Sequence, residues 1–169
     1  MKTTGYQLRE AIKQQTLKRD SLASSFNGTL KVFPEDKKES PNDVMNDFLA
    51  AELAVTKLQL AQMRYNLAVQ VNVLGERITL AEAIKRVGGP ARAEKMWRSV
   101  NSPKRDSYYN RDDDEIDPNK IRAVSVITAK ESLKLAQGAA KHAGAFRAAI
   151  ATGNAVEVEI EDLSSELFE

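Results

Sequence analysis

Apolar residues recur every three or four positions along most of this chain, which is the spacing that places side chains on one face of an α-helix. The first such segment runs from about Tyr6 to Phe26. Asn27 and Gly28 tolerate positive φ, so we expect them to end this helix. Its inward line is apolar at both ends and polar at the centre, in the order Leu8, Ile12, Gln15, Arg19, Leu22 and Phe26.

The longest regular segment has a well-defined start. Ser40 can cap a helix, Pro41 suits the first helical position, and Asp43 lies where a carboxylate interacts favourably with the helix dipole. No Gly or Pro then interrupts residues 44–71, a length of between about seven and eight helical turns. The apolar stripe of this helix is wide enough to need more than one partner surface. It consists of Met45, Phe48, Leu49, Leu53, Val55, Leu60, Met63 and Leu67.

Two shorter helices follow a stretch of alternating residues. Val69–Leu80 alternates apolar and polar positions around a glycine turn, which is typical of a hairpin or a short extended segment. Thr79 and Glu82 have the spacing of a capping box and predict a helix start. We expect Gly88-Gly89-Pro90 to separate this helix from a second one that reaches about Val100.

The C-terminal part combines one long helix with two extended segments. Ala123–Ile127 has the composition of a strand, and a second capping box at Thr128 follows it. The helix then runs from about Ala129 to Ala151, is rich in Ala and Gly, and is expected to stop at Gly153. Val156–Ile160 alternates apolar residues with glutamates, as a half-buried strand does.

These elements predict a mainly α fold, an antiparallel bundle of long helices with a small β element. At most two strands are expected to pair locally, drawn from the three extended segments. Residues 1–153 are expected to form the helical bundle domain, and residues 154–169 an acidic C-terminal strand or tail. With 169 residues, the chain is long enough for a hydrophobic core.

The near-neutral formal charge of +1 conceals a segregation of charge along the chain. Eight Lys and Arg residues lie between Lys85 and Arg111, against two acidic residues. From Asn154 onward every charged residue is acidic. One part of the molecule, or of a neighbouring copy, is therefore expected to complement another.

Cysteine is absent, which excludes disulfides, thiol catalysis and Cys-based metal sites. A cysteine-free chain is compatible with a reducing compartment. The first residues contain no apolar leader segment, and no long apolar run occurs elsewhere. We therefore expect a cytoplasmic protein with no signal peptide and no membrane span.

Residues 79–111 contain the parts of a DNA-binding helix-turn-helix: a short capped helix, a glycine corner and a basic second helix. The register is imperfect, because Val87 or Glu94 falls where the motif needs a glycine or an apolar residue. The favoured interpretation is two core helices with a solvated charged face, and nucleic-acid binding is the alternative. The candidate contacts to nucleic acid or to an acidic partner are Arg92, Lys95, Arg98, Lys104, Arg105 and Arg111.

No residue pattern points to catalysis. Asp112–Asp117 could hold a hard cation, but it lacks the spaced acids and central glycine of a calcium loop, and a solvated acidic turn is the simpler interpretation. His142 is the only histidine, which excludes sites with several histidines. No serine or carboxylate has the spacing of a nucleophile with its base. We therefore expect no enzyme activity, no cofactor and no metal, with a carboxylate-based hydrolase as a third hypothesis.

The expected function is a non-catalytic assembly or protein-interaction module that associates with itself. The wide apolar stripe of the second long helix and the Ala/Gly-rich last helix both favour a close neighbour. The strand at Val156–Ile160 has no hairpin partner beside it in sequence, and an open edge invites pairing with another chain. The expected oligomer contacts are Phe48, Leu49, Leu60, Met63, Val156, Val158 and Ile160.

The order of these segments resembles a family of small helical bacterial and phage proteins, some of them labelled septicolysin-like. The resemblance spans roughly residues 8–154 and rests on "LREAI", "KVFPEDKKESPND" before a long helix ending near "RYN", "GERITLAEAIKR" and "KIRAVSV". It implies an antiparallel helical bundle that assembles into oligomers, and it brings no catalytic residues. Gly88-Gly89-Pro90 and the acidic tail depart from the family pattern. No residue here supports the toxin activity that the label implies.

Overall fold

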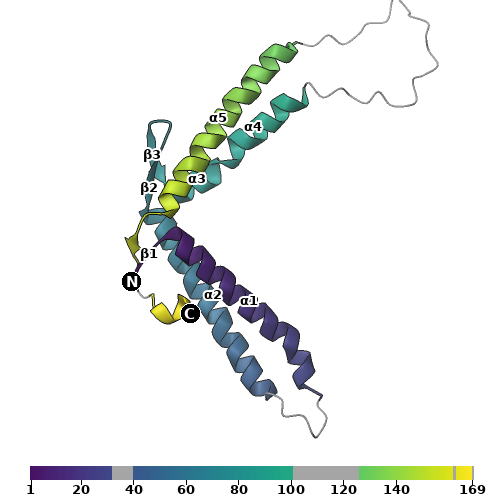
Figure 1. The fold of residues 1–169 in the computed structure, drawn as a ribbon, viewed down its shortest axis with the longest axis vertical. Coiled ribbons are helices and arrows are strands. Elements are labelled where there is room, and N and C mark those ends of the chain that lie inside the picture. Colours follow the sequence, from purple (N-terminus) through teal and green to yellow (C-terminus); the bar gives the residue numbers. More distant parts are fainter. Residues whose placement is uncertain (32–39, 101–125, 162, 169) are drawn as a thin grey trace, which may run out of the picture. The chain divides into compact units, whose positions relative to one another are not determined.

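The computed structural model describes residues 1–31, 40–100, 126–161 and 163–168, and it is mainly α-helical with small β elements, as the sequence predicts (Figure 1). The chain forms two compact units. Unit 1 combines Met1–Ala83 with Ala148–Glu169, and unit 2 is Ile84–Arg147. This division differs from the expected one, because the C-terminal segment belongs to the same compact unit as the N-terminal helices.

Helix α1 covers Gly5–Thr29 and begins with a capping box that the sequence interpretation missed. The Thr4 hydroxyl accepts a hydrogen bond from the Gln7 backbone, and the Gln7 side chain accepts one from the Thr4 backbone at 2.9 Å. The expected stop at Asn27 and Gly28 is wrong. Gly28 stays inside the helix and does not adopt a positive φ, so the turn that would have ended the helix there does not form.

Helix α2 covers Pro41–Ala68 and starts as predicted, with the Ser40 hydroxyl accepting from the Asn42 backbone. Its buried face differs from the expected stripe. Only Val55 of the eight stripe residues is buried, and the buried side chains range in size from Ala to Tyr. The large buried side chains are Leu58 and Tyr65, and most of the large stripe residues are exposed. The buried set is Val44, Ala51, Val55, Leu58, Ala61 and Tyr65.

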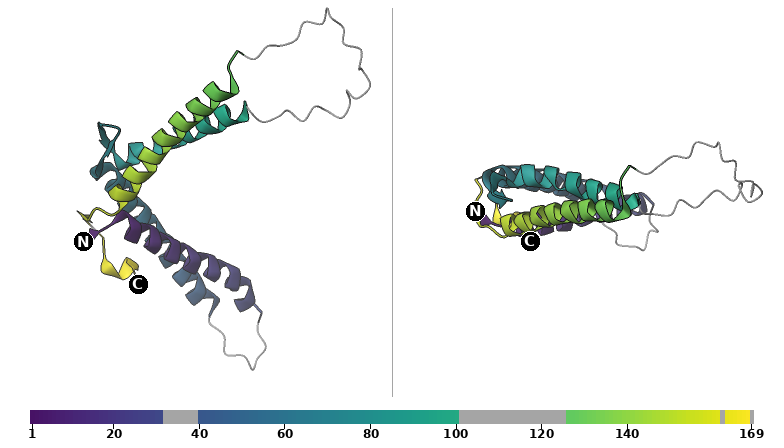
Figure 2. Two further views of the ribbon diagram at one scale, coloured as in Figure 1. Left: turned by 45° about the horizontal axis from the view of Figure 1, so that its top comes forward. Right: turned by 90° about the horizontal axis from the view of Figure 1, so that it is seen from above.

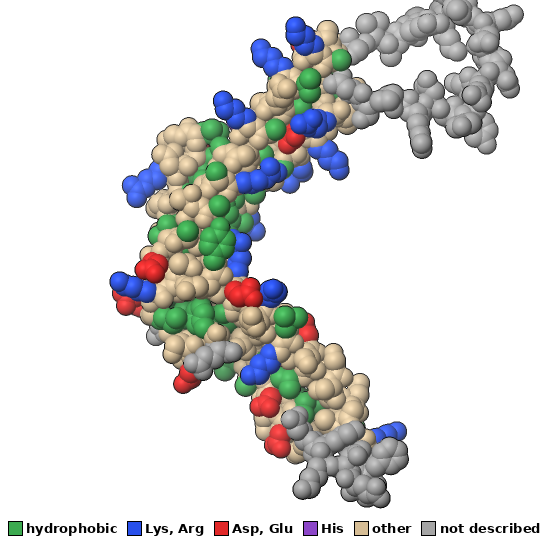
Figure 3. Space-filling model, in the orientation of Figure 1, with side chains coloured by type: hydrophobic (Ala, Val, Ile, Leu, Met, Phe, Trp, Pro, Cys, Tyr) green, Lys and Arg blue, Asp and Glu red, His purple; other side chains and the backbone are tan. Residues whose placement is uncertain are grey.

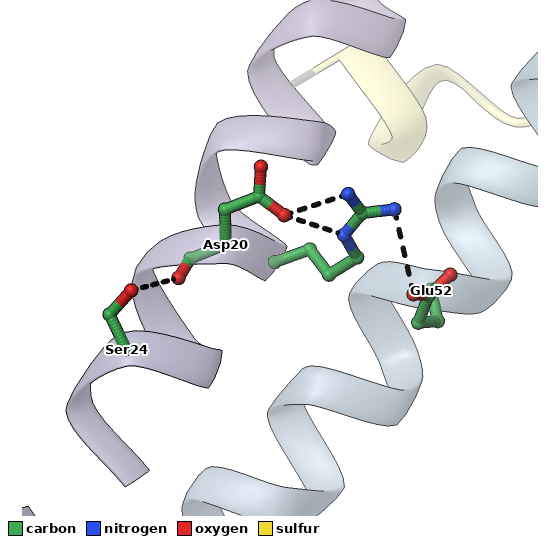
Figure 4. Close-up of polar contacts among 4 residues, drawn as sticks. Asp20, Ser24 and Glu52 are labelled. Atoms are coloured by element: carbon green, nitrogen blue, oxygen red, sulfur yellow. Dashed lines mark hydrogen bonds and ion pairs between the residues drawn. The ribbon is translucent and has the colours of Figure 1, made fainter.

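Helices α1 and α2 lie side by side and antiparallel, with the end of α1 against the start of α2 (Figure 2). Their contact has the polar centre that the sequence predicts. Arg19 of α1 donates to Asp20 and reaches Glu52 of α2 at 3.5 Å, while Ser24 donates to the Asp20 carbonyl (Figure 4). These carboxylates, Asp20 first, raise the pKa of the Arg19 guanidinium.

The predicted hairpin forms from β2 (Gln70–Val73) and β3 (Glu76–Thr79), paired antiparallel. Leu74 and Gly75 take the turn with φ values of 54° and 89°, a region that glycine adopts without strain. The Asn72 side chain accepts from the Gly75 backbone at 3.0 Å and closes the turn.

A second two-stranded sheet joins the two ends of the chain. β1 (Lys2–Thr3) pairs antiparallel with β4 (Val158–Glu159), and the Met1 and Ile160 backbones bond to each other. The local pair is the β2–β3 hairpin drawn from Val69–Leu80, as expected, and the β1–β4 pair is a long-range one that the sequence interpretation did not include. The tail strand has an intrachain partner, which lies about as far away in sequence as the chain allows. Of the other expected strand, residues 123–125 lie outside the described part, and Val126 and Ile127 are not in a strand.

The end of the long helix α5 (Ala129–Asn154) packs tightly within unit 1. Gly153 does not stop this helix. Instead, a Cβ at Gly153 would lie 2.7 Å from the Val71 side chain, so the glycine permits close approach. The fully buried Tyr65 hydroxyl lies 2.7 Å from the carbonyls of both Gly153 and Val156. Burial raises the pKa of this phenol, so it remains a hydrogen-bond donor. A short helical turn, η1 (Ser165–Phe168), follows the sheet.

Unit 2 contains the end of α3 (Leu80–Arg86), then α4 (Gly88–Ser99), and α5 as far as Arg147. Thr79 caps α3 and Thr128 caps α5, as both capping boxes predict. Helices α4 and α5 contact each other at Ser132, whose hydroxyl donates to the Trp97 carbonyl. Further along α5, the Arg86 guanidinium at the end of α3 lies 5.5 Å from the centre of the Phe146 ring.

Candidate interaction surfaces

The outer face of α2 is the largest exposed apolar row among the described residues of unit 1. Successive α-helical residues are rotated by about 100°, which places the whole row within an arc of about 80°. Its side chains are between 38% and 61% exposed. We call this row the outer face of α2, and it consists of Met45, Leu49, Leu53, Leu60, Met63 and Leu67.

This row has the spacing of a coiled-coil seam. Starting at Leu49, the positions alternate by four and three residues through Leu53, Thr56, Leu60, Met63 and Leu67. In heptad terms, Leu53, Leu60 and Leu67 occupy a positions, and Leu49, Thr56 and Met63 occupy d positions. Leu60 is 51% exposed and Leu67 61% exposed, although such positions are normally covered by a partner helix.

The expected oligomer contacts thus separate into two groups. Leu49, Leu60 and Met63 are exposed, whereas Phe48 is half-buried and lines a small apolar cavity of about 210 Å³ between α1 and α2. In the tail, Val156 is exposed, Val158 is half-buried and Ile160 is buried in the fold. The role given to the tail strand is corrected accordingly. One of its two edges is paired with β1 of the same chain, and Ile160 cannot serve a neighbouring copy while it is buried.

The helix-turn-helix corner expected at Gly88-Gly89-Pro90 does not form. A single residue, Val87, separates α3 from α4, and its backbone remains in the right-handed helical region at φ −55° and ψ −30°. DNA-binding helix-turn-helix motifs need a turn of three or four residues to reorient the second helix. Arg92, Lys95 and Arg98 lie on α4, and Lys104, Arg105 and Arg111 lie outside the described residues.

Unit 2 is strongly basic among its described residues. These include nine Lys and Arg residues against Glu94 and Glu131, a formal excess of seven positive charges. Figure 3 shows Lys and Arg side chains gathered over α4 and α5. Both acids already have local partners. Glu94 pairs with Arg98 at 2.9 Å, and Glu131 caps α5 through Thr128, whose hydrogen bonds lower the pKa of the Glu131 carboxyl.

A groove of about 920 Å³ lies beside α5 in this basic unit. Trp97 of α4 forms one wall, and Gly138 leaves its floor open, since no atom lies within 4 Å of where a Cβ would be. Lys134 and Glu131 also line it. We call it the α4–α5 groove, and its remaining lining includes Ile127, Leu135, Ala139 and His142.

The lysines of α5 were missed by sequence reasoning, which stopped at Arg111. Lys130, Lys134 and Lys141 are exposed and fall within about 40° of one another around the helix. Lys134 lines the α4–α5 groove, so the three follow one edge of it. We call them the lysine row. Their spacing of four and seven residues was readable as one helix face, but only the fold brings that face beside Trp97.

The described residues include no group of three or more His, Asp or Glu side chains that could hold a metal ion. The acidic segment Asp112–Asp117 lies outside them. No described helix is both long and apolar enough to cross a membrane.

No family model, curated protein or solved structure matches this chain.

Proposed function

We propose that the protein is a non-catalytic assembly module that pairs with a second copy of itself through the outer face of α2. The observation that carries this proposal is the heptad spacing of large apolar side chains that are exposed. Its place of action would be the cytoplasm, with which a cysteine-free chain is compatible. There it would form part of a larger cellular or viral structure.

Burial supplies the driving force for this pairing. Covering a Leu or Met side chain completely contributes about 1.5–3 kcal/mol, so each half-exposed residue would add about 1 kcal/mol. The seam from Leu49 to Leu67 is about 27 Å long at 1.5 Å per residue. Because both copies contribute the same residues, a symmetric pair buries each of them twice.

Flanking charges favour a parallel pair. Glu52, which also reaches Arg19 of its own chain at 3.5 Å, occupies a g position and Lys57 the next e position, and g pairs with the following e′ in parallel coiled coils. In an antiparallel pair e would face e′, which would bring the cations Lys57 and Arg64 of the two copies together. Exposed ion pairs contribute about 0–1 kcal/mol each. The flanking charges would therefore set the orientation of the two helices, while burial of apolar side chains would supply most of the binding free energy.

The test is sedimentation equilibrium of the full chain and of Leu60→Glu. We expect the full chain to be a dimer at micromolar concentration. In the variant two carboxylates would meet at the seam, and the dissociation constant should rise at least about 100-fold, or about 2.7 kcal/mol. Leu17→Glu on α1 is the matched control, because Leu17 is 59% exposed and lies off the outer face of α2. A monomeric full chain, or equal weakening by both variants, would refute the proposal.

A further inference from the structure

Apart from self-association, unit 2 combines three features in one place: a hollow, an aromatic wall and an excess of cations. The α4–α5 groove is within the volume range of ligand sites, about 300–1,000 Å³. Trp97 is the only tryptophan in the chain and is half-buried in the groove wall. No described side chain fills the space over Gly138.

Cations lie along one edge of this groove. The lysine row places its first two ammonium-bearing residues about 6 Å apart along the helix axis, and the third about 10 Å further on. Lys134 itself lines the groove. Glu131, the acidic residue in the lining, is held by Thr128 at the start of α5, so its charge is already hydrogen-bonded.

We propose that the α4–α5 groove binds single-stranded nucleic acid, with a base stacked on Trp97 and the phosphates held by the lysine row. Proteins that bind single strands without sequence preference combine an aromatic platform with a positively charged track. The excess of seven positive charges among the described residues of unit 2 gives the charge complementarity with a polyanion.

Duplex DNA fits the observations less well than a single strand. Reading a major groove with a helix-turn-helix needs a reoriented second helix, and α3 and α4 are separated only by Val87 in helical conformation. A stacked duplex also offers no base face to a tryptophan within a groove. An anionic membrane would be met by residues that protrude, whereas Trp97 lines a hollow.

Trp97 provides its own readout, because it is the only tryptophan and its fluorescence reports the groove. We expect a 20-residue oligo-dT to quench this fluorescence and to bind in an anisotropy assay. Trp97→Ala should weaken binding at least about fivefold, the lower range for one stacked base, and Trp97→Phe should retain most of it. Inorganic polyphosphate should bind without the same quenching, because it carries no base.

The lysine row is tested by salt dependence. Replacing Lys130, Lys134 and Lys141 together by Ala should make the slope of log K against log salt shallower by about 2, because each phosphate neutralised on a single strand contributes about 0.7. The control replaces Lys13, Lys18 and Lys31 of unit 1 by Ala, a change of equal charge away from the outer face of α2, which should leave affinity and slope unchanged.

Two glycines of α5 give a pair of variants that do not threaten folding. Gly138→Leu fills the groove, while Gly144→Leu adds the same side chain where the groove does not reach, and both positions have open space. We expect only Gly138→Leu to abolish quenching.

The proposal is overturned if oligo-dT does not bind, or if duplex binds equally well without quenching. It is also overturned if vesicles containing phosphatidylserine bind and oligo-dT does not, or if both glycine variants behave alike. None of these readouts depends on dimerisation, so they are separate from the test on Leu60.

Discussion

Units 1 and 2 are each built around a pair of helices, yet they use their surfaces in opposite ways. In unit 1, the buried face of α2 includes the fully covered Leu58 and Tyr65, and six other large apolar residues of α2 remain exposed. In unit 2, no side chain of α4 is fully buried, and an open groove lies beside α5. The closely packed unit therefore offers a flat apolar row to another helix, and the open unit offers a hollow.

The two units also differ in their balance of basic and acidic residues. Among the described residues, unit 1 carries a nearly balanced set of basic and acidic side chains, whereas unit 2 carries nine basic and two acidic ones. A nearly balanced surface with an apolar row suits a protein partner, while an excess of cations suits a polyanion. The net charge of the whole chain, +1, hides this difference.

The difference in packing between units 1 and 2 is tested most strongly by replacing one glycine with alanine in each unit. A Cβ at Gly5 would lie 2.5 Å from the Asn154 side-chain oxygen and 2.8 Å from the Tyr65 ring. Gly5→Ala should therefore lower the free energy of unfolding by about 1–3 kcal/mol through overpacking. Gly144→Ala, in an open helical position of unit 2, should raise it by about 0.5–1 kcal/mol. Urea denaturation of both variants measures the difference, and equal effects would contradict the contrast.

A smaller effect is expected from removing one hydroxyl in unit 1. Tyr65→Phe removes the hydroxyl that lies 2.7 Å from the Gly153 and Val156 carbonyl oxygens, so these acceptors lose their hydrogen bond to Tyr65. We expect the free energy of unfolding to fall by about 1–2 kcal/mol in thermal or urea denaturation. Tyr6→Phe is the matched control, since that hydroxyl is exposed and donates to the Ala151 carbonyl at 3.3 Å. If both changes cost the same, burial of the Tyr65 hydroxyl does not matter.

The smallest predicted effect concerns pH at the start of α5 in unit 2. Hydrogen bonds from Thr128 lower the pKa of the Glu131 carboxyl below its ordinary value. The stabilisation is therefore fully present above that ordinary value and is lost as the pH falls through the lowered one. Thr128→Ala should return the pKa to its ordinary range, as measured by NMR titration of the Glu131 carboxyl. An unchanged titration would show that the capping box does not stabilise the charged form of the Glu131 carboxyl.

Local features of the sequence predicted the fold well where a few neighbouring residues decide the structure. Ser40, Thr79 and Thr128 cap helices as expected, and the hairpin turns at Leu74 and Gly75. Each of these depends on a side chain bonding to a backbone no more than three residues away, or on a local φ value. Such contacts do not require knowledge of the rest of the chain.

Long-range contacts decided the features that sequence reasoning missed. Gly153 was expected to end the last helix, but the reason for a glycine at this position is the close approach of the Val71 side chain. The β1–β4 pair joins residues at opposite ends of the chain, so no local pattern indicates it. On α2 the buried face differs from the expected stripe, because Leu58 and Tyr65 are fully buried while most of the stripe residues face solvent. The lysine row became a candidate only once α5 was found beside Trp97.

The most direct test of the proposed parallel pairing uses single cysteines in a chain that has none. Leu49→Cys and Leu67→Cys lie near opposite ends of the seam, and Leu17→Cys on α1 is the exposed control. In a parallel pair each seam position faces itself, near the Cα separation of about 4.4–6.8 Å typical of disulfides. We therefore expect both seam variants, and not the control, to form disulfide-linked dimers on mild oxidation. In an antiparallel pair the two ends would lie about 27 Å apart. Failure of both variants to cross-link beyond the control would contradict the account.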